Sequence, residues 1–521
     1  MAHSHGKTSE EKLELGPGAN KLFVVSLVVG LIGLAVAFGT SMMTDLGVRR
    51  FYFAYLIAFA FFMSFPVGGL FFVLLQYCVR AGWSVNIRRV PEAFARTFPL
   101  FLILAIPLLF SIVKYDGALY RWAQPVEAAH GGSAHGGAGH GGESHGSASN
   151  AAAGDGSKAP AAGTHSAGGN RSVHPTGELT SPGAPAVGWA PYLHDSFKTP
   201  LYALPRSGDP NAYQFGDPLP ITADGRPLPI DTYLVAPKKD HPLLLGKWGV
   251  IARIFGFLAI FSLIAYWYSS KSRKQDTTGD VGITDTLSVR AAPMLVIFGV
   301  GVTSLASDLL MSLDPAWYST MYGPYYFAGS AISVMAGTII VLKILQFCGY
   351  LKGSVNNDHF HDLSKFQFAF TFFWGYLAFS QFMLLWYASL PETAYWLARR
   401  GASTAETHLE TFGGFTVVSL ALLFGKLLIP FAGLLSRHVK RNPFGQLFWA
   451  VWILCFHALD IYWLVMPELT GRVMVGIPEF AALVGVGGLF VGFVAKNLAS
   501  AKLRPVKDPR APESLAFQQM F

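Results

Sequence analysis

Seven polar side chains within long apolar stretches are the residues of this sequence best suited to chemistry: Arg253, Asp308, Lys343, Gln381, Lys426, His457 and Asp460. Ionisable groups are costly inside a membrane and are kept mainly where protons, ions or substrates move. Asp460 follows His457 by three residues, so the two side chains share one face of a helix. These residue types make the seven side chains candidates for proton transfer, and no catalytic residue is predicted.

The stretches that carry these residues are predicted to be membrane helices. Hydrophobic residues make up 52% of the 521 residues and charged residues only 13%, which excludes a water-soluble domain. About ten stretches have spanning length, at residues 22–39, 51–79, 97–113, 247–268, 291–312, 324–349, 366–389, 412–435, 445–466 and 474–495. The sequence therefore predicts an all-α integral membrane protein.

The predicted organisation has five parts: an N-terminal tail (1–21), helices one to three (22–113), an insertion (114–246), helices four to ten (247–497) and a C-terminal tail (498–521). The first apolar run lacks a small-residue cleavage site and is expected to stay as a helix. Lys and Arg gather in the loops on the side of the two tails, which predicts that both tails are cytoplasmic and the insertion periplasmic. The net charge of +8 fits anionic lipid at that face and requires no nucleic acid.

The insertion is rich in Gly, Pro and His. His130, His135, His140 and His145 recur every five residues in a Gly-rich tract. This spacing fits either weak binding of a divalent metal or a compositional accident, because no Cys or carboxylate cluster fixes a geometry. No metal site is therefore assigned.

Residues that would bind a redox cofactor are missing from the predicted spans. Of the fifteen His, only His457 lies well inside a span, so paired ligands for a transmembrane haem cannot be assembled. Cys78, Cys348 and Cys455 are scattered and form no motif for a metal, an iron–sulfur cluster or covalent haem. Any electrons would therefore be carried by partner proteins.

The candidate residues can be ordered by their predicted depth. With cytoplasmic tails, Asp308 and Asp460 lie toward the outer side, His457 near the middle, and Lys426 and Lys343 further in. Carboxylates outside, an imidazole in the middle and amines further in form a possible chain of proton carriers across the membrane. Gln381 and Arg253 are placed in the outer half.

Each candidate also has a structural interpretation that the sequence leaves open. Arg253 and Lys343 could extend their charged groups to the two headgroup layers. His457 and Asp460 could form a hydrogen-bonded clasp between helices. Asp308 could cap or tie the aromatic turn that follows it.

Three long segments resemble a known family. Residues 308–330, 361–388 and 457–467 are closely similar to the ActF-type membrane subunit of bacterial alternative complex III, in the NrfD and polysulfide-reductase superfamily. The resemblance covers helices four to ten well and the first three more loosely. It implies two four-helix bundles, formed by helices two to five and six to nine, with one further helix at each end.

The resemblance also implies a function and partners. The expected function is that of a cofactor-free inner-membrane subunit of a respiratory or photosynthetic quinol-oxidising complex, which supports assembly and proton translocation. The implied partners are an ActC-like sister subunit, a periplasmic iron–sulfur subunit, multihaem cytochromes c and a terminal oxidase. Haem c and iron–sulfur clusters would lie in these partners, with quinol in the complex. The alternatives are a standalone ion-coupled secondary transporter and a purely structural membrane anchor.

Overall fold

The computed structural model describes residues 11–114, 118–120, 246–314, 317–388, 396–397, 399–401, 415–470 and 473–519. In this part of the chain, ten helices are long and apolar enough to cross a membrane, and no residue is in a strand. The prediction of an all-α membrane protein with about ten spans is therefore confirmed. Most of the insertion, including His130, His135, His140 and His145, lies outside the described residues.

The first bundle contains the second to fifth spans. They are α2 (Gly47–Cys78), a third span broken into α3 (Arg89–Ala95), α4 (Phe98–Leu104) and α5 (Ile106–Lys114), then α9 (Lys247–Thr278) and α10 (Val281–Leu309). In this bundle, α2 packs against α3 and α10, and α9 packs against α4 and α10. The broken span follows from its sequence, because Pro99 and Pro107, at the starts of α4 and α5, each remove a backbone donor that would continue the preceding helix.

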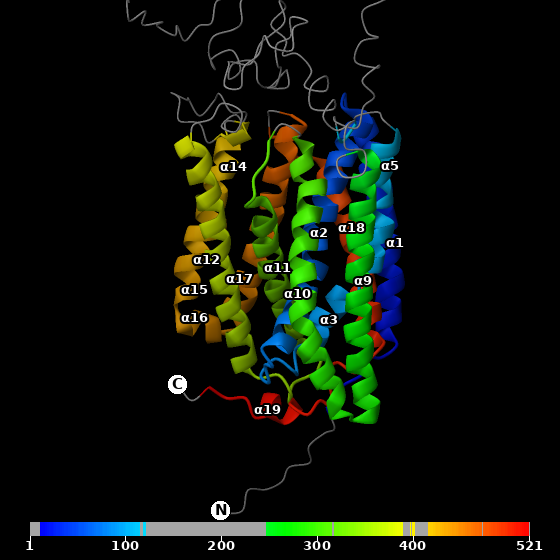
Figure 1. The fold of residues 1–521 in the computed structure, drawn as a ribbon, viewed down its shortest axis with the longest axis vertical. Coiled ribbons are helices and arrows are strands. Elements are labelled where there is room, and N and C mark those ends of the chain that lie inside the picture. Colours follow the sequence, from blue (N-terminus) through cyan, green and yellow to red (C-terminus); the bar gives the residue numbers. More distant parts are fainter. Residues whose placement is uncertain are drawn as a thin grey trace, which may run out of the picture.

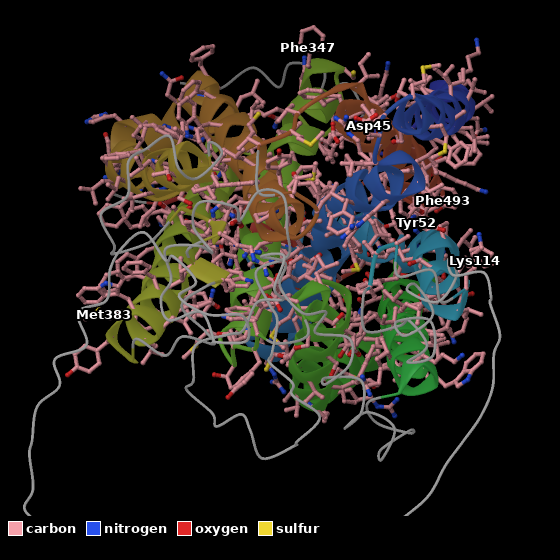
Figure 2. All side chains as sticks on the ribbon, turned by 90° about the horizontal axis from the view of Figure 1, so that it is seen from above. Asp45, Tyr52, Lys114, Phe347, Met383 and Phe493 are labelled. Carbon is pink, nitrogen blue, oxygen red and sulfur yellow. The ribbon has the colours of Figure 1, made fainter. Side chains whose placement is uncertain are left out.

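The second bundle contains the sixth to ninth spans. They are α11 (Tyr322–Phe347), α12 (Asn357–Ala388), an eighth span made of α14 (Phe415–Leu422), a π-helical segment (Leu423–Leu428) and α15 (Ile429–Leu435), and α17 (Pro443–Val465). The short α16 (Arg437–Arg441) links the last two. Helix α11 packs against both α12 and α17, and it also contacts α2 and α10 of the first bundle. The two bundles lie side by side, with α12, α14 and α15 at one edge and α5 and α9 toward the other (Figure 1). Viewed from above, Met383 of α12 and Lys114 of α5 lie on opposite sides of the assembly (Figure 2).

The two remaining spans, α1 (Gly18–Met42) and α18 (Ile477–Ala499), pack against each other along their lengths. Their backbones meet at glycines: a Cβ on Gly33 would lie 2.7 Å from the backbone nitrogen of Gly485. Small residues at such a crossing allow close van der Waals packing where lipid supplies no hydrophobic drive. Helix α18 also contacts α2, so the α1–α18 pair is attached to the first bundle.

Both ends of the described chain lie at the same end of the molecule, here called the terminal end. The backbone N–H of Leu503 donates to the carbonyl of Leu13 at 2.8 Å, and Glu11 accepts from the backbone N–H groups of Gly353 and Ser354. The last segment crosses the terminal end and includes α19 (Ala511–Leu515), at the bottom of Figure 1. The other end of the bundles is called the opposite end.

Three helices extend beyond the predicted spans at the terminal end. Helix α9 continues past residue 268 to Thr278, α10 begins at Val281 rather than at 291, and α12 begins at Asn357 rather than at 366. About 20 residues suffice to cross the hydrocarbon layer, whereas α9 and α12 each have 32. The hydropathy of the sequence marks only the apolar part of such a helix. The polar turns of α9 and α12 bond to the C-terminal segment, as between Asp276 and the backbone N–H of Val506 and between His361 and Gln519.

Candidate functional site

Four of the ionisable or polar side chains of the second bundle meet in its interior. Lys426 Nζ donates to Asp460 Oδ2 at 2.5 Å and lies 3.1 Å from His457 Nδ1. The Tyr325 hydroxyl of α11 donates to Asp460 Oδ1. Lys426 is fully buried, and His457 and Asp460 are each 1% exposed. We call Lys426, His457, Asp460 and Tyr325 the lysine cluster.

Aromatic rings and one glycine enclose the lysine cluster. The Lys426 ammonium lies 4.3 Å from the centre of the Trp374 ring on α12, where a cation–π interaction adds to its ion pair. The Phe61 ring of α2 lies 5.7 Å from the imidazole of His457. On α11, a Cβ at Gly329 would lie only 2.6 Å from His457 Cε1, so only glycine leaves room for the ring. The charges are therefore shielded on several sides.

The directions of the helices explain why Lys426 and Asp460 meet. Helical side chains lean toward the N-terminus of their own helix. The eighth span runs toward the terminal end and α17 runs away from it, so Lys426 leans toward the opposite end while Asp460 leans back to meet it. The sequence places Lys426 further in than Asp460, and the long lysine side chain spans this difference so that the two charged groups meet.

The backbone around Lys426 is also unusual. Lys426 lies in the π-helical segment, where the regular hydrogen-bond pattern of an α-helix is interrupted. The carbonyl of Gly425 accepts a hydrogen bond from Trp452 Nε1 at 2.7 Å, which satisfies a backbone group in this segment from α17. Single-turn π-bulges occur frequently at functional sites. Here the bulge carries the only cation of the lysine cluster.

The protonation of the cluster follows from its contacts. When Lys426 is an ammonium and donates to His457 Nδ1, that nitrogen is unprotonated and the neutral imidazole carries its proton on Nε2. His457 Nε2 has no hydrogen-bond partner among the described residues. With Lys426 positive and Asp460 negative, the cluster is neutral overall. It can hold one additional proton on the imidazole.

Arg253 and Asp308 form a separate pair in the first bundle. Arg253 Nε and Nη2 donate to the two carboxylate oxygens of Asp308, both at 2.8 Å. The Arg253 side chain is 28% exposed and that of Asp308 is 12% exposed. The Ser312 hydroxyl donates to the backbone carbonyl of Asp308 rather than to its carboxylate. Thus the carboxylate of Asp308 binds an arginine on the neighbouring helix and does not join the lysine cluster.

Lys343 and Gln381 also lie apart from the lysine cluster. The Lys343 ammonium lies 3.7 Å from the centre of the Phe360 ring, near the start of α12. The Gln381 carbonyl accepts from the Ser319 hydroxyl at 3.0 Å in the aromatic turn. Of the seven predicted residues, the structure therefore brings three together, Lys426, His457 and Asp460. It does not form the single chain that the predicted depths suggested.

Two members of this site were missed by sequence reasoning. Tyr325 is the last residue of the aromatic turn that follows Asp308 (residues 312–325), and Trp374 is one of many aromatic residues in the spans. Neither has a sequence signal of its own, because hydroxyl and indole groups are common in membrane helices. Both become apparent only when α11 and α12 are packed against the face of α17 that carries His457 and Asp460.

A second charged group fixes the opposite end of the second bundle. Arg400, 1% exposed, donates to Glu468 Oε1 at 3.0 Å and lies 3.6 Å from the centre of the Trp396 ring. The Trp396 ring stacks on that of Trp317 at 4.0 Å. Arg399 also binds Glu468. These contacts tie the chain after α12 to the end of α17.

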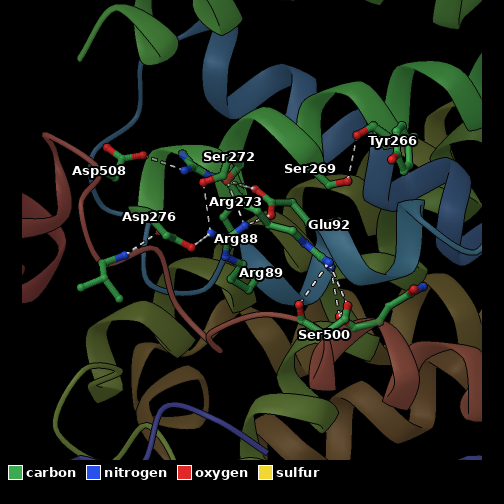
Figure 3. Close-up of polar contacts among 12 residues, drawn as sticks. Arg88, Arg89, Glu92, Tyr266, Ser269, Ser272, Arg273, Asp276, Ser500 and Asp508 are labelled. Atoms are coloured by element: carbon green, nitrogen blue, oxygen red, sulfur yellow. Dashed lines mark hydrogen bonds and ion pairs between the residues drawn. The ribbon is translucent and has the colours of Figure 1, made fainter. Parts of the chain in front are cut away.

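A third charged group lies at the terminal end of the first bundle (Figure 3). Arg88 donates to Glu92 at 3.2 Å and to Asp508 of the C-terminal segment at 2.7 Å, and Arg89 donates to Glu92 at 2.7 Å. Burial alone would lower the pKa of Arg88, but nearby Tyr77, Asp508 and Glu92 outweigh it, so the pKa is raised and the guanidinium stays charged. This network attaches the C-terminal segment to α3.

Within the described ranges, no group of three or more His, Cys, Asp or Glu side chains could hold a metal ion. The three cysteines are free thiols and all are exposed at the surface of the chain. No protein-family model matches the sequence, and no curated protein matches it. The lysine cluster is therefore the site from which function is best argued.

Proposed function

We propose that this chain is a cofactor-free membrane subunit of a quinol-oxidising electron-transfer complex, and that the lysine cluster passes protons within it. The observation that carries the proposal is the contact of Lys426 with both His457 and Asp460 in a fully buried position. Ionisable groups at such positions are costly and mark proton or ion pathways in membrane proteins. Two of the three segments that resemble the ActF-type subunit, 308–330 and 457–467, supply Tyr325, His457 and Asp460 to this cluster.

The cluster has the chemistry that a proton relay needs. Its neutral state holds one ammonium and one carboxylate, and the imidazole of His457 can accept a further proton at Nδ1 once Lys426 donates to Asp460 alone. The proton then leaves Nδ1 for a water molecule, which restores the neutral imidazole with its proton on Nε2, and Lys426 returns to Nδ1. Each step changes the partner of Lys426 between two atoms that it already reaches, at 2.5 and 3.1 Å.

The energy for directional movement must come from the complex. Moving one elementary charge against 100 mV costs about 2.3 kcal/mol. We propose that haem c and iron–sulfur centres in partner subunits, with quinol as the electron donor, supply it through a conformational change at the second bundle. In the same proposal, the terminal end faces the cytoplasm of a bacterial inner membrane, because the loops rich in Lys and Arg lie there.

The test uses the intact complex, purified from its native membranes and reconstituted in vesicles, with protons moved per electron as the readout. Lys426→Met and Asp460→Asn are expected to abolish most of the proton yield while quinol oxidation continues. Lys343→Met is the matched control, since it makes the same substitution at a lysine that lies against the Phe360 ring and outside the lysine cluster.

Two outcomes would contradict the proposal. An unchanged proton yield in assembled Lys426→Met and Asp460→Asn complexes would show that the cluster is a structural clasp. Purification of the chain alone, without haem c absorption or co-purifying subunits, would contradict the proposed membership of a complex and favour a standalone transporter.

A further inference from the structure

A line of buried polar side chains follows one face of α12 toward the lysine cluster. His361, Ser364, Gln367 and Thr371 recur at spacings of three and four residues, as expected for one face of a helix. All four are buried, and Ser364, Gln367 and Thr371 have no exposed surface. The next turn of the same face carries Trp374, whose ring contacts the Lys426 ammonium. We call His361, Ser364, Gln367 and Thr371 the α12 polar face.

The hydrogen bonds of this face leave acceptor positions unused. The Ser364 and Thr371 hydroxyls each donate to a carbonyl one turn earlier in α12, at 2.8 Å. Gln367 Nε2 is 3.4 Å from the carbonyl of Trp449 on α17, while Gln367 Oε1 has no partner among the described residues. A buried amide oxygen without a partner is costly, and such groups are commonly satisfied by internal water.

A second unpartnered amide lies beside the terminal end of the same face. Gln446 of α17 is 1% exposed, and its Nε2 donates to Asn357 Oδ1 at 3.1 Å and to the carbonyl of Lys440 at 2.6 Å. Its Oε1 has no partner among the described residues. The boundary between α12 and α17 therefore contains two buried amide oxygens that lack a partner among the described residues.

The terminal end of this face reaches the C-terminal segment. His361 Nδ1 lies 2.8 Å from Gln519 Oε1, and the backbone N–H of Gln519 is 3.3 Å from Asp358 Oδ2. Lys365, one residue beyond Ser364, has an exposed side chain that pairs with Asp362. Asp358 and His361 are therefore titratable groups at the terminal end of this face, where it meets the C-terminal segment.

We propose that the α12 polar face is the terminal-side limb of the proton path, with water molecules linking its side chains from His361 to the lysine cluster. This inference rests on the proposed function. It places the α12 polar face where the sequence had predicted Lys343 as the proton carrier nearest the cytoplasm. From His361 to Trp374 the helix rises about 20 Å at 1.5 Å per residue, roughly two-thirds of the ~30 Å hydrocarbon thickness. The hydrogen bonds of Ser364, Gln367 and Thr371 go to backbone carbonyls and do not join these side chains to one another, so the proposed path needs bridging water.

The central test is Gln367→Leu in the intact, vesicle-reconstituted complex. Leucine has a similar volume but cannot bind water, so most of the proton yield per electron should be lost while quinol oxidation and thermal stability are retained. Gln367→Asn keeps an amide and leaves room for a water molecule, and it should retain most of the yield. A purely structural role of Gln367 would change stability without separating these two variants in proton yield.

A matched pair of serines provides the control. Ser364 and Ser262 are both buried, and each hydroxyl donates to the carbonyl four residues earlier, but Ser262 lies on α9 in the first bundle. Ser364→Val should lower the proton yield and Ser262→Val should not. Equal effects of the two variants, or a full yield in Gln367→Leu, would overturn the proposed limb.

Lys426→Met separates this inference from the proposed function. If Lys426→Met abolishes the proton yield while Gln367→Leu and Ser364→Val leave it intact, the lysine cluster acts in proton transfer and the limb is wrong. If Lys426→Met also leaves the yield intact, both fail together. Loss of yield in Lys426→Met, Gln367→Leu and Ser364→Val supports both.

Discussion

Removing the Lys426 ammonium is expected to lower the free energy of unfolding by about 3–5 kcal/mol, the usual cost of breaking a buried ion pair by deleting one partner. The charges are 2.5 Å apart, which corresponds to an attraction of ~7 kcal/mol at an effective dielectric constant of about 20. Desolvation of both charges offsets most of that attraction. After Lys426→Met, Asp460 would keep the Tyr325 hydroxyl as a donor but would lose its cation.

The double variant Lys426→Met with Asp460→Asn provides the decisive test of this reasoning. It removes both charges, so no uncompensated ion remains, and replacing a buried pair by neutral groups is often close to neutral in stability. We expect the double variant to be more stable than either single variant. The free energy of unfolding of all four proteins would be measured by denaturant titration in detergent micelles.

Additive costs would refute this reasoning. If the double variant loses the sum of the two single losses, the side chains do not interact energetically despite their contact. The 2.5 Å contact between Lys426 Nζ and Asp460 Oδ2 would then make no net contribution to stability. The same proteins supply the complexes needed for the proton-yield measurement, so loss of assembly and loss of proton transfer can be told apart.

Two further predictions separate the lysine cluster from its surroundings. Gly329→Ala should push the His457 ring, cost about 1–3 kcal/mol through overpacking and lower the proton yield. Gly299→Ala, where a Cβ meets nothing within 4 Å, should instead be neutral or stabilising by up to about 1 kcal/mol; thermal denaturation of both would decide. Arg253→Met breaks the partly exposed pair with Asp308, so it should cost about 1 kcal/mol or less and leave the proton yield unchanged. A lower proton yield in Arg253→Met would show that the Arg253–Asp308 pair takes part in proton transfer.

Hydropathy predicted the architecture well because the constraint behind it is strong. A backbone in lipid must satisfy its own hydrogen bonds, so apolar runs of spanning length become helices. What it could not predict were polar helix ends such as residues 357–365 of α12, where packing and not lipid stabilises the helix. The break of the third span follows from its prolines, yet the apolar run 97–113 looks continuous by hydropathy alone.

The candidate site was predicted in part for a similar reason. A cost attaches to every buried charge, so Lys426, His457 and Asp460 could be identified as candidates from their positions alone. Their mutual contact depends on rotation about the helix axes, which the sequence does not specify. Arg253 shows the same limit from the other side: the sequence left its partner open, and the structure places it in an ion pair with Asp308 on the adjacent helix.

The π-helical segment gives the lysine cluster a route to two states. Lys426 lies 2.5 Å from Asp460 and 3.1 Å from His457, so a small shift of the ammonium exchanges its stronger partner. A regular α-helix resists such a shift because each residue is held by hydrogen bonds to the turns on both sides, whereas a π-bulge interrupts that pattern at this position. Packed cores respond to small movements by switching between discrete arrangements. In the proposed complex, a modest displacement of the eighth span would therefore suffice to move Lys426 from Asp460 to His457.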